Sequence, residues 1–414
     1  MKNKPSAWVP SLYLAEALPY VAVMVIATTM YKRLGLSNTD LALYTSWLYL
    51  PWVIKPLWSP FIASIRTERW WVLVMQLLIG AGFAGIAFTL PTSFWLQGSL
   101  AFFWILAFAS ATHDIAADGL YILGLSTHDQ SLYVGVRSTF YRIGNIVGQG
   151  LLVMLAGWLE KSQTVAMAWS ISFLVLAGAF LALWLWHSVA LPKTTTAKAV
   201  SEGGFAAFSL ALKTFFTKPH ILSALLFMLL FRFPEGQLVK IANPFLLDSA
   251  EAGGLALSTE AVGFVYGTVG IIGLTIGGLL GGWCVSRHGL KRWLWPMVLS
   301  ISLPDLVYVY LADAGEASFL IVNVCVFIEQ FGYGFGFTAY MLYLVYFSQG
   351  ERSTAVFSIC TAMQALGMML PGMIAGWMAD HLGYLNFFWW VVGCCLVTFF
   401  VSALIKVDPN YGKK

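Results

Sequence analysis

Two carboxylates stand four residues apart at the end of a long apolar run. Asp114 and Asp118 follow the apolar stretch that begins near Trp95. On an α-helix, residues four apart lie one turn apart on the same face. An acid in a helix that crosses a membrane costs about 2.5–3.5 kcal/mol by insertion scales, and it normally faces the protein interior or a water-filled cavity. The pair is therefore either an ion-paired cluster that holds helices in register or a proton or substrate site.

Two further charged residues interrupt apolar runs in the first part of the chain. Glu16 lies in the first run, and Tyr20 follows it on the same helical face. Lys55 lies within residues 51–60, where three prolines bend or interrupt a helix. Its ammonium either reaches the membrane surface along its own stem, pairs with a carboxylate, or meets an anionic substrate.

A polar stripe follows, with Arg142, Asn145 and Gln149 spaced three and four residues apart. This spacing puts the three side chains on one helical face. The guanidinium offers paired donors and the two amides offer donors and acceptors, which suits a sugar or an anionic group as well as an internal hydrogen-bond network. Gly144 and Gly148 allow close approach of another helix on a neighbouring face.

Polar residues in the second half repeat this arrangement. Arg232 and Glu235 are three residues apart, close enough to pair on one helix. Glu329 and Tyr333 share a helical face. Gln364 belongs to a row of polar side chains at helical spacing, which mostly serve as packing contacts between helices.

The composition is that of a polytopic membrane protein. Of the 414 residues, 59% are hydrophobic and only 10% are charged, whereas soluble proteins carry about 25% charged residues. A net charge of +4 is too small to indicate nucleic-acid binding. The five cysteines show no CxxC spacing, so we expect no metal site and no cofactor.

Stretches of about 20 apolar residues, the length needed to cross a bilayer, predict the architecture. Twelve are present, near residues 8–30, 41–62, 71–90, 96–122, 132–158, 164–189, 219–241, 261–283, 293–312, 317–347, 353–378 and 385–405. We therefore expect an all-α polytopic membrane protein with twelve transmembrane helices in two six-helix bundles. The predicted parts are an N-terminal bundle (1–190), a cytoplasmic linker (191–218) with a short helix at 205–216, and a C-terminal bundle (219–414).

Lysine and arginine predict the orientation, because cytoplasmic loops are enriched in both. With the N-terminus in the cytoplasm, fifteen of these residues lie on the inner side and three, Lys32, Arg33 and Lys161, on the outer side. The remaining five lie within predicted spans. We therefore expect both termini to be cytoplasmic.

Residues 282–292 resemble the G-x-x-x-D-R-x-G-x-K-R loop of the major facilitator superfamily, with Ser286 in place of the acid. Residues 60–69 resemble a degraded copy, with Ser64 at the same place. The resemblance implies two parallel halves with a substrate site between them. It also implies a gating role for this loop through Arg287.

Other motifs resemble the AmpG-type muropeptide permeases, a branch of that superfamily related to the acetyl-coenzyme A transporters. They are Leu18-Pro19, Pro51-Trp52-x-x-Lys55-Pro56, Asp114-x-x-x-Asp118-Gly119 and Glu329-x-x-x-x-Gly334-x-Gly336. The resemblance implies a proton-coupled secondary transporter of the bacterial inner membrane that works by alternating access. It would import N-acetylglucosaminyl-anhydro-N-acetylmuramyl sugars and peptides.

We assign the polar residues of the spans to three roles on this basis. The predicted proton-coupling residues are Asp114, Asp118 and Glu16. The predicted substrate-binding residues are Lys55, Tyr20, Arg142, Asn145, Gln149, Glu329, Tyr333 and Gln364. The predicted gating residues are Arg137, Arg287, Arg232 and Glu235. The expected partners are protons, an amino sugar or peptide-bearing sugar and the lipid bilayer, and we expect a monomer.

Two alternatives stay open from the sequence. One is a carrier of another anionic amphiphile, such as a siderophore or a coenzyme A thioester. The other is a membrane-embedded transferase, which usually needs a catalytic His or Asp near the membrane surface; among the histidines, only His113 lies clearly inside a span. The chain has no G-x-x-x-x-G-K-[ST] loop, which disfavours an ATP-driven pump. We therefore expect a transporter and not an enzyme.

Overall fold

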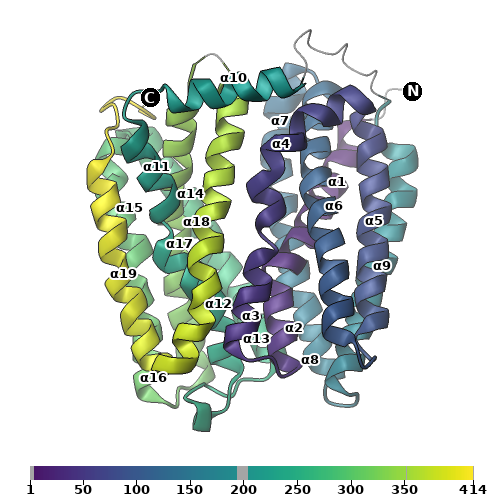
Figure 1. The fold of residues 1–414 in the computed structure, drawn as a ribbon, viewed down its shortest axis with the longest axis vertical. Helices are drawn as coiled ribbons and strands as arrows, with labels where there is room; N and C mark the ends of the chain where they lie inside the picture. The colour runs from purple at the N-terminus through teal and green to yellow at the C-terminus, as the bar shows by residue number, and fades with distance from the viewer. Residues whose placement is uncertain (1–3, 194–203, 351, 414) are drawn as a thin grey trace. The chain divides into compact units, whose positions relative to one another are not determined.

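The computed structural model describes residues 4–193, 204–350 and 352–413, and every regular element in these ranges is helical (Figure 1). Eleven helical runs among them are long and apolar enough to cross a membrane. The first run, Pro5–Arg33, and the run Trp95–Gly124 carry the acids singled out above. The prediction of an all-α, multi-pass membrane protein is confirmed.

The second predicted span, 41–62, is not one continuous helix. It consists of α3 (Asn38–Trp47) and α4 (Leu50–Ile65), with Leu48 and Tyr49 between them. Pro51 lies in the first turn of α4, where a missing N–H is tolerated because that group has no partner within the helix. The proline-rich stretch 51–60 was predicted to bend or interrupt this helix; the break lies just before it, and α4 continues through all three prolines. The break explains why eleven runs rather than twelve qualify by length.

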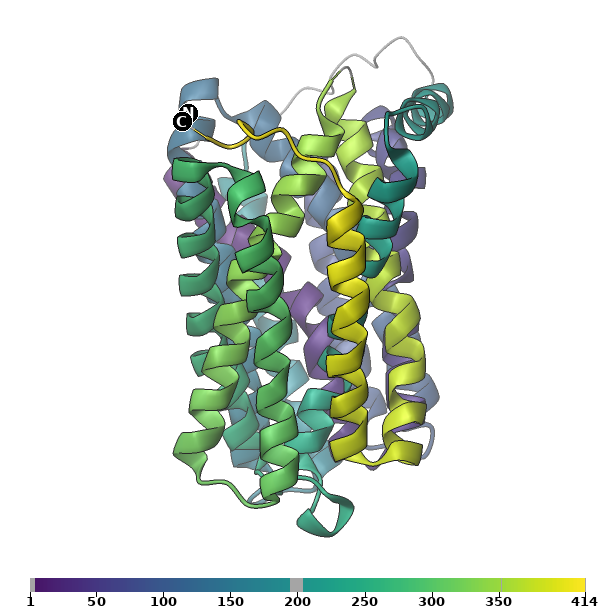
Figure 2. The ribbon, with the colours of Figure 1, turned by 90° about the vertical axis from the view of Figure 1, so that its left-hand side faces the viewer.

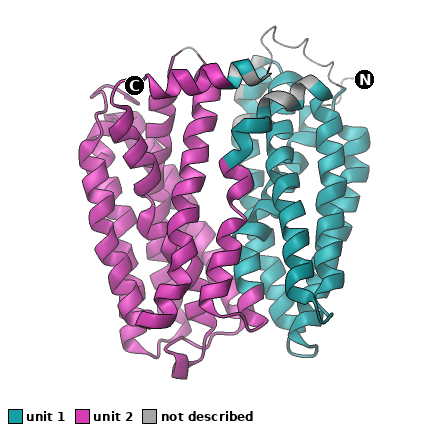
Figure 3. Cartoon of the chain, viewed as in Figure 1, with its two compact units in different colours: residues 1–30, 54–208 teal, residues 31–53, 209–414 magenta. Residues whose placement is uncertain are grey.

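The chain divides into two compact units (Figure 3). Unit 1 consists of residues 1–30 and 54–208, and unit 2 of residues 31–53 and 209–414. The predicted division at 191–218 stays a prediction, and residues 194–203 of that linker lie outside the described residues. A short helix, α10 (Gly204–Phe216), covers the stretch where one was expected.

Unit 1 is built on two sets of helix contacts. Helix α5 (Glu68–Thr89) packs on α6 (Trp95–Gly124) and α9 (Val165–Ala190), and α1 (Pro5–Val21) packs on α7 (Thr127–Asn145) and α6. Gly144 and Gly148 let α7 and its continuation approach α1. A Cβ at Gly144 would lie 2.7 Å from Ala17 Cβ, and one at Gly148 would lie 3.0 Å from Val21 Cγ1. The close approach predicted from these glycines is confirmed. The other elements of unit 1 are η1 (Ala22–Ile26), the start of α2 (Ala27–Arg33), most of α4, η2 (Ile146–Leu152) and α8 (Val153–Leu159).

Unit 2 has its largest helix contact between α14 and α17 (Figure 2). A Cβ at Gly277 would lie 2.1 Å from Phe331 O, and one at Gly334 would lie 2.1 Å from Leu274 O, so the two backbones touch. Its elements are α3, α11 (Ile221–Leu230), α12 (Phe233–Leu247), η3 (Ala250–Ala252), α13 (Thr259–Phe264), η4 (Val265–Gly270), α14 (Ile271–His288), α15 (Leu290–Ser302), η5 (Leu303–Asp305), α16 (Leu306–Ala314), α17 (Phe319–Ser348), α18 (Ser353–Leu382) and α19 (Tyr384–Leu404).

Residues 31–53, here called the 31–53 segment, belong to unit 2 although they precede most of unit 1 in the sequence. Helix α3 of this segment packs on α18 and also contacts α12. The fit depends on Gly376, because a Cβ there would lie 1.8 Å from Asn38 O and 2.8 Å from Ala42 Cβ. The close contact therefore requires glycine at this position of α18.

Polar contacts hold the 31–53 segment in place. Lys32 Nζ lies 2.7 Å from Asp248 Oδ2, which also accepts a hydrogen bond from Tyr384 at 2.5 Å. The backbone N–H and the hydroxyl of Thr39 both donate to Asp380 Oδ2, at 2.9 and 2.7 Å. These contacts bind the first part of the segment to unit 2.

Gly376→Ala is expected to weaken this docking, because the added methyl group overlaps the backbone of α3. Overpacking of this kind typically costs about 1–3 kcal/mol. The measurement is the cross-linking yield between cysteines at positions 39 and 380 in a background without the native cysteines. The yield should fall several-fold in Gly376→Ala. Gly393→Ala is the matched control, since a Cβ at Gly393 meets nothing within 4 Å, and equal yields in the two variants would contradict the expectation.

Candidate carboxyl site

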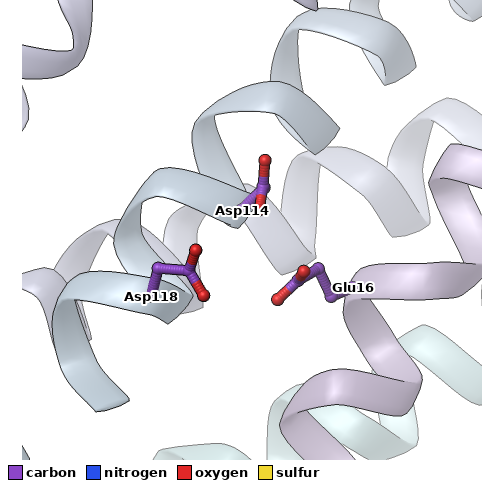
Figure 4. A group of neighbouring side chains, drawn as sticks. All are labelled: Glu16, Asp114 and Asp118. Carbon is purple, nitrogen blue, oxygen red and sulfur yellow. The ribbon is translucent and has the colours of Figure 1, made fainter. Parts of the chain in front are cut away.

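Three acids from two helices of unit 1 form a cluster. Glu16 comes from α1, and Asp114 and Asp118 come from α6. One carboxylate oxygen of each lies within 4.8 Å of those of the other two. Figure 4 shows Glu16 and Asp118 turned toward each other, with Asp114 one turn along α6. The expectation that the two aspartates share a helical face agrees with this arrangement, and the structure adds the third acid to them.

Two cations neutralise the aspartates. Lys55 of α4 donates to Asp114 Oδ2 in an ion pair. Arg137 of α7 lies with Nη2 2.7 Å from Asp118 Oδ1, which also accepts a hydrogen bond from the Tyr13 hydroxyl at 3.1 Å. The Arg137 guanidinium stacks 4.4 Å from the centre of the Tyr13 ring. Lys55 thus pairs with a carboxylate, one of the three options that the sequence left open for it.

Glu16 differs from the two aspartates. It is 8% exposed, and it has no ion-pair partner among the described residues. Its Oε2 atom is buried and accepts no hydrogen bond within the described part of the chain. Burying an ionised carboxylate without compensation is costly, so such a group takes up a proton or a cation instead.

The charges of the cluster therefore do not cancel when every group is ionised. Three acids, Glu16, Asp114 and Asp118, face two bases, Lys55 and Arg137. The sum is one negative charge around the buried carboxyl of Glu16, and neighbouring carboxylates resist ionising together. One bound proton, or one bound monovalent cation, makes the cluster neutral. The arrangement is chemically suited to binding and releasing a single positive charge.

A buried polar network that the sequence analysis missed lies beside this cluster. The Gln76 side chain of α5 lies 3.1 Å from His113 Nε2 of α6 and 2.8 Å from His187 Nδ1 of α9. Ser11 Oγ of α1 lies 2.8 Å from His187 Nε2. All but Ser11 are fully buried. Polar residues inside predicted spans were a usable signal, but the sequence does not show which of them meet.

The remaining predicted residues of unit 1 lie along α1 and α7. Tyr20 is on α1, and Arg142 and Asn145 are in the last turn of α7. Gln149 lies in η2, a π-helical segment, and such segments are frequent at functional sites. All four side chains are partly buried. Asn145 Oδ1 is buried and accepts no hydrogen bond in the described residues, so it offers an acceptor to a ligand.

The predicted residues of unit 2 form hydrogen bonds of their own. Glu329 on α17 accepts from Gln330 Nε2 at 2.9 Å and from the Tyr308 hydroxyl at 3.4 Å. Tyr333 accepts a hydrogen bond from Arg232 Nη2 at 2.6 Å. Both Glu329 and Arg232 are buried. These contacts are compatible with a structural as well as a binding role.

Three other predicted residues complete the set in unit 2. Glu235 is buried in the first turn of α12, and Gln364 is partly buried on α18. Arg287 is exposed in the last turn of α14, with its guanidinium 4.6 Å from the centre of the Trp283 ring. The predicted substrate and gating residues thus come from both units, and their roles stay predictions.

Comparisons with known proteins place this geometry in context. No family model matches the chain. The anhydromuropeptide permease of Escherichia coli (strain K12) is 24% identical over 395 residues, which cover 90% of this chain and 74% of the permease. A protein of Rickettsia conorii described as putative transporter AmpG 4 is 22% identical, with 94% of each chain covered. The resemblance inferred from the motifs is confirmed by these homologues.

Solved transporter structures share the fold. The nucleoside transporter NupG matches with a TM-score of 0.74 at 16% identity, covering 97% of this chain and 99% of that one. A D-xylose–proton symporter matches with a TM-score of 0.73 at 13% identity, covering 99% of each chain. At this level of identity the likeness shows the common fold.

A charge-removal cycle tests the ion pair between α4 and α6. Lys55→Met leaves Asp114 without its partner, which is expected to cost about 1–3 kcal/mol or more. Adding Asp114→Asn removes the orphaned charge and should recover most of that loss. The measurement is the thermal unfolding of the detergent-solubilised protein. A double variant no more stable than Lys55→Met would show that the two groups are not energetically coupled.

Proposed function

We propose that this chain, which has the fold of major facilitator transporters and AmpG permeases among its homologues, is a proton-coupled secondary transporter of the bacterial inner membrane. Its substrates are cell-wall muropeptides, the N-acetylglucosaminyl-anhydro-N-acetylmuramyl sugars and peptides, which it imports by alternating access. It acts as a monomer, with both termini in the cytoplasm, and carries out no covalent chemistry on its substrate.

The uncompensated charge of the carboxyl cluster carries the proposal of proton coupling. Glu16 holds the exchangeable proton, since Asp114 and Asp118 each have a cation of their own. Loss of that proton leaves a net negative charge that competes for Lys55 and Arg137. These two bases come from α4 and α7. A change of ion-pair partner therefore moves α4 or α7 relative to α1 and α6, which couples release of the proton to a change in conformation.

The substrate class is supported by the homologues and by the donors and acceptors along α7 and η2. Amino sugars carry hydroxyl and N-acetyl groups, which require both hydrogen-bond donors and acceptors. Asn145 and Gln149 supply both kinds, and Asn145 Oδ1 is an acceptor still available. Arg142 supplies paired donors to a carboxylate. We assign these three side chains to substrate binding on that ground.

Glu16→Gln is expected to uncouple transport from the proton gradient. Symport of one proton under a gradient of one pH unit accumulates substrate about tenfold, because one unit corresponds to about 1.4 kcal/mol. The measurement is the uptake of labelled anhydro-disaccharide into proteoliposomes, with and without the gradient. The variant should equilibrate the sugar without concentrating it, while sugar–sugar exchange without a gradient persists.

Glu251→Gln, at an exposed acid of unit 2, is the matched control and should concentrate sugar as the unaltered protein does. Tenfold accumulation by Glu16→Gln would remove the coupling role from Glu16. If the unaltered protein takes up sugar rapidly and independently of the gradient, it is a channel or uniporter and not a coupled carrier. Chemical alteration of the recovered sugar would indicate an enzyme.

A further inference from the structure

Helix α12 carries a buried ammonium group with no carboxylate to balance it. Lys240 is 1% exposed and has no ion-pair partner among the described residues. Its Nζ atom donates a hydrogen bond to Thr45 Oγ1 at 3.0 Å and lies 4.9 Å from the centre of the Tyr49 ring. Both partners are neutral, and both belong to the 31–53 segment.

Those contacts compensate the buried charge only in part. A cation over an aromatic ring gains about 0.5–2 kcal/mol, whereas burying an ammonium without a counter-ion costs several kcal/mol. Lys32 shows the ordinary solution in the same unit, because it lies 2.7 Å from Asp248. An ionisable residue kept inside a membrane span without such a partner indicates a functional role.

A hydroxyl without a hydrogen-bond partner lies near the Lys240 side chain. The Ser46 hydroxyl is buried and has no hydrogen-bond partner in the described residues. A Cβ at Gly372 would lie 2.7 Å from Ser46 Oγ and 3.4 Å from Lys240 Cγ, so both side chains lie beside the same glycine. An ammonium and a hydroxyl without an acceptor are the groups that a carboxylate satisfies.

The 31–53 segment controls access to these donors. It joins unit 1 at Met30 and at Ile54 but packs in unit 2, where Thr45 and Tyr49 contact the Lys240 ammonium. It is held there by the close packing of α3 on α18 and by polar contacts, such as those from Thr39 to Asp380. Release of the segment removes both neutral partners of the ammonium, which can then bind an anion.

We propose that Lys240 is a carboxylate-binding residue for the transported substrate. With the 31–53 segment released, the Lys240 ammonium pairs with a carboxylate of the substrate. When the segment returns, Thr45 and Tyr49 take over the ammonium and the carboxylate is displaced. The inference rests on the proposed function, because a muramyl sugar brings its own lactyl carboxylate or the carboxylates of its peptide. It is distinct from the predicted sites in unit 1, and it adds a residue of α12 to them.

The test compares two probes that differ only in charge. One is the anhydro-disaccharide with a free lactyl carboxylate, and the other is its neutral lactyl methylamide. We measure exchange of labelled disaccharide in proteoliposomes without a gradient. For each probe, the result is the concentration that halves this exchange. The unaltered protein should prefer the acid about tenfold or more, since charge-assisted hydrogen bonds contribute about 1.5–3 kcal/mol. Lys240→Gln should lose that preference because its affinity for the acidic probe falls while its affinity for the amide is unchanged. Lys240→Arg should keep the preference.

Lys161→Gln is the matched control, since Lys161 is exposed in unit 1, and it should leave both values unchanged. Ser46→Ala removes only an unsatisfied hydroxyl, so it folds even where a neutral residue at 240 does not. Ser46→Ala should lower the affinity for the acidic probe several-fold and leave the affinity for the amide unchanged.

If Lys240→Gln retains the preference for the acid, the assignment of Lys240 is wrong and the transporter proposal still stands. If Lys240→Gln does not fold, the same conclusion follows from a preference retained by Ser46→Ala. Equal affinity of the unaltered protein for acid and amide leads to the same conclusion. An unaltered protein that exchanges neither probe overturns the proposed function together with this inference.

Discussion

Asp114 and Asp118 can lie in an apolar helix only because cations from two other helices reach them. Lys55 comes from α4 and Arg137 from α7. An acid left alone in a membrane interior costs several kcal/mol, so these contacts constrain where the helices stand. Apolar surfaces alone would let helices slide or rotate in a bilayer, because lipid tails are as apolar as the side chains. Glu16 differs from the two aspartates because both bases already form ion pairs with Asp114 and Asp118.

The buried charged residues of unit 2 have neutral hydrogen-bond partners. Arg232 Nη2 donates to Tyr333, and Glu329 accepts from Gln330 and Tyr308. Lys240 differs because its partners are supplied by a segment whose two ends continue into the other unit. A charge whose compensation depends on a separable segment responds when that segment moves, whereas a charge paired within a rigid helix bundle does not.

Features that depend on local geometry could be predicted from the amino-acid sequence. Runs of apolar residues indicated the helical spans, three prolines indicated an interruption of the second span, and the spacing of Asp114 and Asp118 placed them on one face. The interruption itself lies at Leu48 and Tyr49, just before the first proline. The helical repeat and the missing proline N–H act within a few residues, so their effects can be inferred without the fold. The motifs also identified the relatives.

Which residues meet could be learned from the tertiary structure alone. It joined each of the two aspartates to a cation from another helix, brought Glu16 to the same cluster, and linked Gln76 to two histidines far away in the chain. It also placed the 31–53 segment over Lys240, against the order of the sequence. These pairings depend on how each helix is rotated about its axis, and that rotation is set by long-range packing and by the need to balance every buried charge.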